Sequence, residues 1–338
     1  MQPRTRRLLT LALIGAGVAA LVGPGRRQAV RRVANRVRDD IDDDWYDLPD
    51  GVKTRDVPTH DGGSVHLVEI GEGRPLVLLH GVTLAAEVWA PIMHLARDRF
   101  RIIALDVRGH GASVVGDDGV GRVPAAHDLA TVLEELDLTD VVVMGHSMGG
   151  MILGRFCGDY PDVLRARVAG LVFMDTAVSQ LIPPGLDLAA DRLGAAILAR
   201  EAAGAASPKP HPDIELLMTR VAFGAKPSGR AVQITTRLGH DLADEYRSKL
   251  WIDLFATDNR DGLARVTQPA TVIVGSRDAL TPVWAARRII DNLVDGELVV
   301  LPGVGHQAMQ EAPRAVVAAV EDLVTRIEAR ETATPRSA

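Results

Sequence analysis

The chain has 338 residues, 47% hydrophobic and 24% charged, so it can bury the core of one large domain or two small ones. Its one cysteine excludes an intrachain disulfide. No motif in the sequence suggests a metal site, a dinucleotide site or a phosphate-binding loop. The net charge of the whole chain is −6, but residues 1–38 contain nine arginines and no acidic residue. The remaining 300 residues are therefore strongly acidic, which argues against a nucleic-acid partner.

An uncharged apolar run occupies residues 8–25. As a helix it would be about 27 Å long, close to the ~30 Å hydrocarbon core of a bilayer, so it predicts a short membrane anchor. The alternative is a secretory signal peptide that would be cleaved near residue 20 and would export the protein. Three arginines precede the run and six follow it, so the positive-inside rule places the body of an anchored protein in the cytoplasm.

A basic amphipathic helix is predicted at residues 26–41. Valines and an isoleucine recur there at helical spacing, and six arginines fill the other faces. This pattern is typical of a helix on an anionic membrane surface, and the alternative is a helix that packs on the body. The acidic stretch 39–50 predicts a solvated linker, so residues 1–50 form a separate unit and the folded domain begins near Val52.

Short apolar runs alternate with helical segments in the body. Strands are predicted at 64–70, 75–79, 101–106, 140–144, 170–174, 270–275 and 297–301. Helices are predicted at 124–136, 148–158, 282–292 and 311–328. Continuous runs of valine, isoleucine and leucine between helices indicate strands that are buried on both faces. The predicted fold class is therefore α/β, with a mostly parallel, doubly wound sheet.

The interval 177–265 contains several helical segments and no convincing strand. Helices inserted between two strands are expected to form a cap over one end of the sheet. Ligands in open α/β sheets bind at the carboxyl ends of the strands, so a cap there would roof the site. The core is then predicted at 51–176 and 266–330, with a disordered tail at 331–338.

The segment 141–153 reads VVVMGHSMGGMIL, an apolar run that leads through two spaced glycines into a helical stretch. This is the G-x-S-x-G nucleophile elbow, in which Ser147 sits at a strained apex with φ > 0. Gly145 and Gly149 are required because strand and helix cross closely there. His146 belongs to the elbow but points away from the apex. The alternative is a glycine-rich loop that contains an incidental serine.

A serine hydroxyl needs a base, and the best candidate is His306 in a glycine-rich loop after the last predicted strand. A carboxylate must fix the histidine's tautomer, and Asp278 follows the preceding strand. Asp175, just after the strand at 170–174, is the reserve acid. The order serine, aspartate, histidine is the one expected after a nucleophile elbow.

The oxyanion of an acyl-transfer intermediate needs two backbone N–H donors. One is expected from Met148, directly after the serine. The other is expected from Val82, in a loop where Gly81 lets the chain approach closely. His80 and His110 lie in neighbouring loops and are interpreted as structural.

Together these segments resemble the α/β-hydrolase fold superfamily, as a serine esterase or lipase-like hydrolase with a helical cap. The resemblance covers about residues 52–328 and rests on five motifs. These are HG at 80–81, DVRGHGAS at 106–113, GHSMGG at 145–150, GSRDALTP at 275–282 and GHQAMQEAP at 305–313. It implies a Ser147–His306–Asp278 triad without a cofactor. A serine at the elbow argues against the epoxide hydrolases and haloalkane dehalogenases, which use an aspartate there.

The leading interpretation is hydrolysis of carboxylic esters with acyl or lipid-like groups, because the cap is apolar and the amino terminus points to a membrane. Cofactor-free haloperoxidases or perhydrolases, C–C bond hydrolases and acyltransferases use the same triad, and the sequence leaves them open. A non-catalytic binding protein of the same fold would normally lack a member of the triad.

Overall fold

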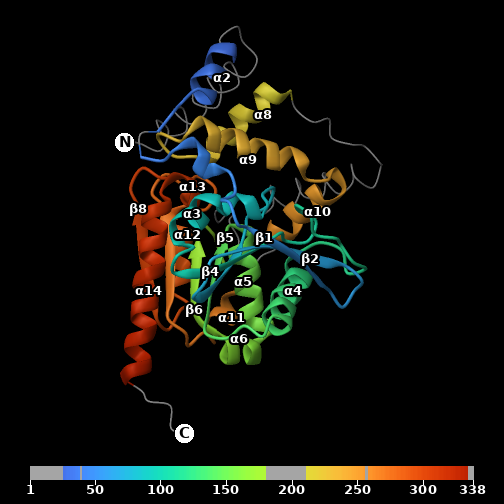
Figure 1. Cartoon of the computed structure of the whole chain (residues 1–338), viewed down its shortest axis with the longest axis vertical. Helices are drawn as coiled ribbons and strands as arrows, with labels where there is room; N and C mark the ends of the chain where they lie inside the picture. Colours follow the sequence, from blue (N-terminus) through green and yellow to red (C-terminus); the bar gives the residue numbers. More distant parts are fainter. Residues whose placement is uncertain (1–25, 39, 180–210, 256–257, 334–338) are drawn as a thin grey trace, which may run out of the picture.

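The computed structural model describes residues 26–38, 40–179, 211–255 and 258–333. Eight strands in this part of the chain form one sheet in the order β1-β2-β4-β3-β5-β6-β7-β8 (Figure 1). They are β1 Lys53–Pro58, β2 Ser64–Ile70, β3 Arg74–Leu79, β4 Phe100–Leu105, β5 Val141–His146, β6 Val168–Met174, β7 Ala270–Gly275 and β8 Gly296–Leu301. β2 pairs antiparallel with β1 and β4, and the other pairs are parallel, which confirms the mostly parallel sheet.

Helices cover both faces of the sheet. They include α3 Ala90–Ala96, α4 Arg122–Glu135, α5 Met148–Asp159, α6 Pro161–Arg167, α12 Val283–Ile290 and α14 Pro313–Ala333. Successive strand residues point to opposite faces. In β5, Val141 and Val143 join the core under α4, α5 and α12, whereas Val142 and Met144 join the core under α3 and α14. Because both faces are covered, the strands read as continuous apolar runs.

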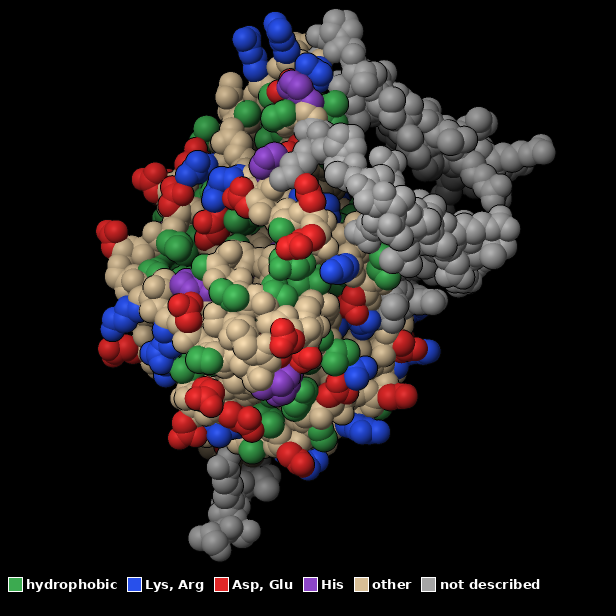
Figure 2. Space-filling view, turned by 90° about the vertical axis from the view of Figure 1, so that its right-hand side faces the viewer, with side chains coloured by type: hydrophobic (Ala, Val, Ile, Leu, Met, Phe, Trp, Pro, Cys, Tyr) green, Lys and Arg blue, Asp and Glu red, His purple; other side chains and the backbone are tan. Residues whose placement is uncertain are grey.

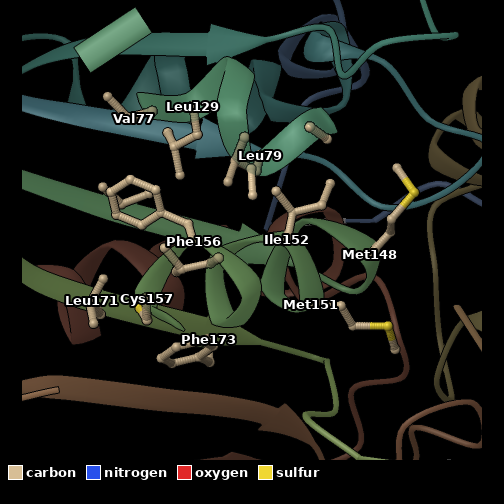
Figure 3. Close-up of a cluster of buried hydrophobic side chains, with 14 of the residues drawn as sticks. Val77, Leu79, Leu129, Met148, Met151, Ile152, Phe156, Cys157, Leu171 and Phe173 are labelled. Atoms are coloured by element: carbon tan, nitrogen blue, oxygen red, sulfur yellow. The ribbon is translucent and has the colours of Figure 1, made fainter. Parts of the chain in front are cut away.

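The helix α5 is anchored deep in one of these cores. Figure 3 shows its Ile152 and Phe156 among side chains of β3, α4 and β6, including Leu79 and Leu129. Cys157 is fully buried in the same cluster and acts there as a small apolar side chain. The helix therefore fixes the chain rigidly at its first residue, next to Ser147.

The prediction missed β1, α3 and α6. In β1 only Val57 is buried, so its sequence KTRDVP shows no apolar run. The strand forms because all six of its residues pair with β2. The short helices α3 and α6 each begin with a proline within their first two positions, which favours a helix start without a long apolar pattern.

Helices α8 Pro212–Thr219, η3 Arg220–Ala222, α9 Gly229–Asp241, α10 Asp244–Phe255 and α11 Arg260–Leu263 lie between β6 and β7. The described part of this interval contains no strand, and residues 180–210 of the predicted cap lie outside it. The amide of Ala225 donates to the carbonyl of Gly303, just after β8. Gly239 of α9 lies opposite Thr83, just after β3. The cap therefore sits at the carboxyl ends of the strands.

The predicted basic helix is shorter than expected and makes different contacts. It is α2 Arg26–Ala34, and it lies beside α8 and α9 at one end of the molecule (Figure 1). Its Val30, Val33 and Ala34 pack against the core under the cap, so its apolar face is turned to protein. Within the described ranges no helix is long and apolar enough to cross a membrane, and the apolar run at 8–25 lies outside them.

The prediction of a solvated acidic linker at 39–50 was wrong. Ile41 and Tyr46 are each only 3% exposed, and η1 Asp43–Tyr46 is packed against α3 and α9. The hydroxyl of Tyr46 also donates to the carbonyl of Gln310. Ile41 and Tyr46 therefore hold the segment on the body, although residues 39–50 contain seven aspartates. At the other end α14 continues to residue 333, beyond the predicted start of the tail, and residues 334–338 lie outside the described part.

Candidate active site

Ser147 stands at the junction of β5 and α5 in a strained conformation. Its φ is 51° and its ψ is −115°, an angle pair that a residue with a side chain rarely adopts. Its amide donates to the carbonyl of Met174 on β6, 3.0 Å away, which fixes the turn to the neighbouring strand. The side chain therefore stands at the sharp apex that the sequence predicted.

The two glycines of the elbow are required by close backbone approaches. A Cβ atom on Gly145 would lie 2.4 Å from the carbonyl oxygen of Gly149, inside the turn itself. A Cβ atom on Gly149 would lie 2.1 Å from the carbonyl oxygen of Leu79 on β3. The first glycine thus lets strand and helix cross, and the second lets the helix approach the neighbouring strand.

His306 and Asp278 complete a chain of hydrogen bonds from the serine. The Ser147 hydroxyl lies 2.9 Å from His306 Nε2, and His306 Nδ1 lies 2.8 Å from Asp278 Oδ2. These partners assign the proton of the neutral ring to Nδ1, which leaves Nε2 free to accept from Ser147. All three side chains are at least nine-tenths buried. The structure therefore brings together the three residues that the resemblance implied.

The charges of the residues in this series of hydrogen bonds favour the role of His306 as a base. Burial alone would lower the pKa of His306, but the charge of Asp278 and the hydrogen bond to it outweigh burial and raise it. Burial would raise the pKa of Asp278, but His306 and the Thr281 hydroxyl and amide lower it to about 2. Asp278 is therefore an anion at neutral pH and stabilises the imidazolium that forms when His306 takes a proton.

The reserve acid Asp175 is not bonded to His306. Its carboxyl oxygens accept instead from the amides of Gly275, at 2.8 Å, and Ala308, at 3.1 Å. The side chain is completely buried, and burial, together with the charge of Asp278, raises its pKa. Asp175 therefore joins the strand β7 to the helix that follows His306.

The two amides expected to bind an oxyanion flank Ser147. Met148 is the first residue of α5, so its N–H has no intrahelical acceptor. Gly81 packs so closely that a Cβ atom there would lie 3.0 Å from Ser147 Cβ, which brings the Val82 loop beside the nucleophile. No acceptor is present for either amide among the described residues. Both donors are thus available at the site.

Three buried histidines hold the surrounding loops rather than react. His80 donates from Nδ1 to the carbonyl of Gly81 and accepts the amide of Val107, and burial lowers its pKa to about 4. His110 accepts the amide of Thr83, which adopts a φ of 65°. His146 donates from Nε2 to the carbonyl of His306 at 2.7 Å, and burial lowers its pKa to about 3. All three rings are neutral at physiological pH and act as structural supports.

Comparison with known proteins identifies the family. The model of the alpha/beta hydrolase family matches residues 76–320, well over half of the chain. The chain belongs to the alpha/beta hydrolase family. This alpha/beta hydrolase is 29% identical to a non-heme chloroperoxidase of Burkholderia pyrrocinia over 243 residues. These residues cover 70% of this chain and 86% of the chloroperoxidase.

Other proteins to which this chain is similar carry different names. A 2-(acetamidomethylene)succinate hydrolase of Mesorhizobium japonicum is 26% identical over 273 residues, which cover 77% of this chain and 91% of that protein. An esterase of Exiguobacterium antarcticum superposes with a TM-score of 0.68 at 22% identity, over 82% of this chain and 100% of the esterase. The last similarity shows the shared fold. The family and its fold, which the sequence resembled, are thereby confirmed.

Two threonines that were not predicted from the sequence support this hydrolase site. The Thr281 hydroxyl donates to Asp278 Oδ2 at 2.6 Å, and the Thr281 amide donates to Oδ1 at 2.9 Å. A threonine three residues after an aspartate in a turn is a local signal that would have found it. The Thr176 hydroxyl donates to the carbonyl of Ser147 at 2.6 Å. That bond joins residues 29 positions apart, so no local pattern indicates it.

The described residues contain no group of three histidine, cysteine, aspartate or glutamate side chains that could hold a metal ion. The described residues bring together at the site the Ser147 hydroxyl, the His306 imidazole, the Asp278 carboxylate and the amides of Val82 and Met148. Together they can deprotonate a nucleophile and stabilise an oxyanion.

Proposed function

We propose that this alpha/beta hydrolase cleaves carboxylic esters through an acyl-enzyme intermediate. The observation that carries the proposal is the continuous series of hydrogen bonds from Asp278 through His306 to Ser147. Beside the serine, the amides of Val82 and Met148 have no acceptor among the described residues. A hydroxyl that is bonded to a neutral imidazole is an activated nucleophile. A non-catalytic member of the fold would not be expected to retain this geometry.

The reaction follows from these positions. His306 Nε2 takes the hydroxyl proton as the Ser147 oxygen attacks the ester carbonyl, and the amides of Val82 and Met148 bind the oxyanion. The imidazolium then gives its proton to the leaving alcohol, and the acyl group stays on Ser147. A water molecule, deprotonated by His306, attacks the acyl carbonyl and releases the acid, and the proton returns to Ser147.

The similarity to a non-heme chloroperoxidase favours a second candidate function, which is the formation of a peracid. The same acyl-serine could be attacked by hydrogen peroxide in place of water, which would release a peracid. No additional residue is needed for this reaction, because His306 can deprotonate either molecule. The two activities therefore differ in the acceptor that reaches the acyl group.

The test is a series of p-nitrophenyl esters from acetate to palmitate, measured with the wild type and with Ser147→Ala. We expect hydrolysis by the wild type only, and the dependence on chain length reports the preferred acyl group. A parallel series with hydrogen peroxide and a halide-dependent dye measures peracid formation. Absence of ester cleavage at every chain length would overturn the proposal, and peracid formation faster than hydrolysis would favour the second candidate.

We also propose that the enzyme works at an anionic membrane surface, where lipid esters are available. Arg27, Arg31 and Arg32 of α2 are exposed and form no ion pair with any described residue. Basic side chains gather at the end of the molecule where α2 lies (Figure 2). Met218 and Val221, on the neighbouring α8 and η3, are 58% and 64% exposed. Arginines beside exposed apolar side chains are a combination that favours the headgroup region of a bilayer.

The membrane proposal is tested by flotation of the full chain with vesicles of phosphatidylglycerol and phosphatidylcholine. Replacement of all three arginines by glutamine should weaken partition into the anionic vesicles, by roughly fivefold for each arginine. The control replaces Arg265, Arg277 and Arg287, which are exposed elsewhere, and changes the net charge equally. Equal partition of the two triple variants would contradict the proposal.

A further inference from the structure

Besides Asp278 and Asp175, another buried carboxylate lies beside the site, and none of the steps above uses it. Glu311 is the last residue of α13 Ala308–Glu311 and is 5% exposed. Its Oε1 accepts the amide of Gly305 at 2.8 Å, and its Oε2 accepts the amide of Gly224 at 2.7 Å. Gly305 directly precedes His306, whereas Gly224 belongs to the cap. One carboxylate therefore joins the loop that carries the base to the cap.

The two backbones that Glu311 joins also bond to each other. The amide of His306 itself donates to the carbonyl of Ala222, 2.6 Å away, and the amide of Ala225 donates to Gly303, 3.0 Å away. A Cβ atom on Gly224 would lie 2.1 Å from the Gly303 carbonyl oxygen. The cap segment 222–225 is thus seated directly on the loop 303–306, with no room for a side chain between them.

The amino-terminal segment contributes to the same junction. Arg38 donates to the main-chain carbonyl of Glu311, and Arg36 donates to the carbonyl of Ala225 at 3.2 Å. Arg220 of the cap donates to the carbonyls of Phe223 and Ala225. Three separate parts of the chain therefore meet at Glu311 and the cap segment beside it.

Glu311 also acts on His306 through its charge. Burial lowers the pKa of His306, and the surrounding carboxylates raise it overall, in decreasing order Asp278, Asp175 and Glu311. The other titratable ring that faces it is His146, which is neutral. Burial raises the pKa of Glu311 overall, although the amides of Gly224 and Gly305 and the charge of Arg220 act in the opposite direction. Two amide donors and a nearby guanidinium favour the carboxylate form.

We propose that Glu311 is a positioning residue that couples the cap to the general base. Its carboxylate holds the cap segment 222–225 against the loop 303–306, and this seating sets the place of His306 relative to Ser147. The inference rests on the proposed function, because it gives His306 the role of base. Displacement of the cap segment is then expected to slow the reaction at Ser147, although no cap residue touches the reacting atoms in this role.

The test measures the rate at which a fluorophosphonate labels Ser147, so it needs no knowledge of the natural ester. In that step the Ser147 oxygen forms a bond to phosphorus, fluoride leaves, and His306 takes the hydroxyl proton. Glu311→Gln keeps the size of the side chain but has one acceptor oxygen for two amides. We expect labelling to slow by on the order of ten- to a hundredfold, as for a small misplacement of a catalytic group.

The pH dependence of labelling separates positioning from simple loss of structure. A carboxylate raises the pKa of His306, so its replacement by a neutral amide should lower that pKa and move the acid limb of the profile to lower pH. Gly224→Ala displaces the cap segment without changing a charge, so it should slow labelling and leave the acid limb in place. Glu331→Gln, at an exposed position of α14, is the control and should match the wild type.

Each result decides the proposal. If the wild type is labelled and Glu311→Gln is labelled at the same rate, Glu311 does not position His306. Slower labelling of Glu311→Gln with an unmoved acid limb would indicate a merely structural role and would also overturn the proposal, as would a wild-type rate for Gly224→Ala. Failure of the wild type itself to react would instead refute the proposed function.

Discussion

The serine and the histidine of this site are held by contacts of different range. Ser147 is fixed by its own neighbourhood, because Gly145 and Gly149 allow the turn and α5 is anchored in the core directly after it. The main chain of His306 is held by Ala222 of the cap and by His146 of β5, both far away in sequence. The nucleophile is therefore encoded in a short segment, whereas the position of the base depends on the assembled cap and sheet.

Replacement of Asp278 tests the contacts of His306 with residues distant in sequence, and it has the largest expected effect. Asp278→Asn should lower kcat by about 10⁴-fold, because the amide can stabilise neither the required tautomer nor the imidazolium. Asp175→Asn should lower kcat by less than about tenfold and cost about 1–3 kcal/mol of stability, since one amide of Gly275 or Ala308 loses its acceptor. Ester hydrolysis and denaturant unfolding of both variants provide the measurement. The reverse order of activities would assign the acid to the loop after β6.

The loop that carries Val82 is expected to bind the oxyanion beside Ser147. The variant Val82→Pro tests this role. Proline removes the N–H that is expected to bind the oxyanion, so kcat should fall by about 10²- to 10³-fold with a smaller change in KM. Val82→Ala retains the amide and is the matched control, which should stay close to the wild type. Similar activities of the proline and alanine variants would show that another donor binds the oxyanion.

The same difference in range explains what the sequence could predict. The five-residue elbow predicted Ser147, its strained φ and both glycines, because these features depend on residues close in sequence. The apolar runs predicted seven of the eight strands. The polar edge strand β1 was not predicted, because its stability comes from pairing with β2 rather than from burial. The role of Glu311 was not predicted, because its partners Gly224 and Gly305 meet only in the folded protein.

The amino-terminal segment gives the smallest expected effect, on stability rather than on chemistry. Ile41→Ala should lower the free energy of unfolding by about 2–5 kcal/mol, because a buried side chain leaves a cavity. Val37→Ala, at a position that is 70% exposed, is the matched control and should change it by less than about 0.5 kcal/mol. Denaturant unfolding compares the two. Equal stability would mean that the segment is the solvated linker that its acidic composition suggested.

The proposed reaction depends above all on Ser147 as a nucleophile that His306 activates. It is tested most directly by mass spectrometry of the fluorophosphonate-treated protein, with Ser147→Ala and His306→Ala treated in parallel. We expect one adduct in the wild type, on the peptide that contains Ser147, and no adduct in Ser147→Ala. Labelling of His306→Ala should be slower by on the order of 10³-fold or more. An adduct on another residue, or labelling of Ser147 at an equal rate without His306, would contradict it.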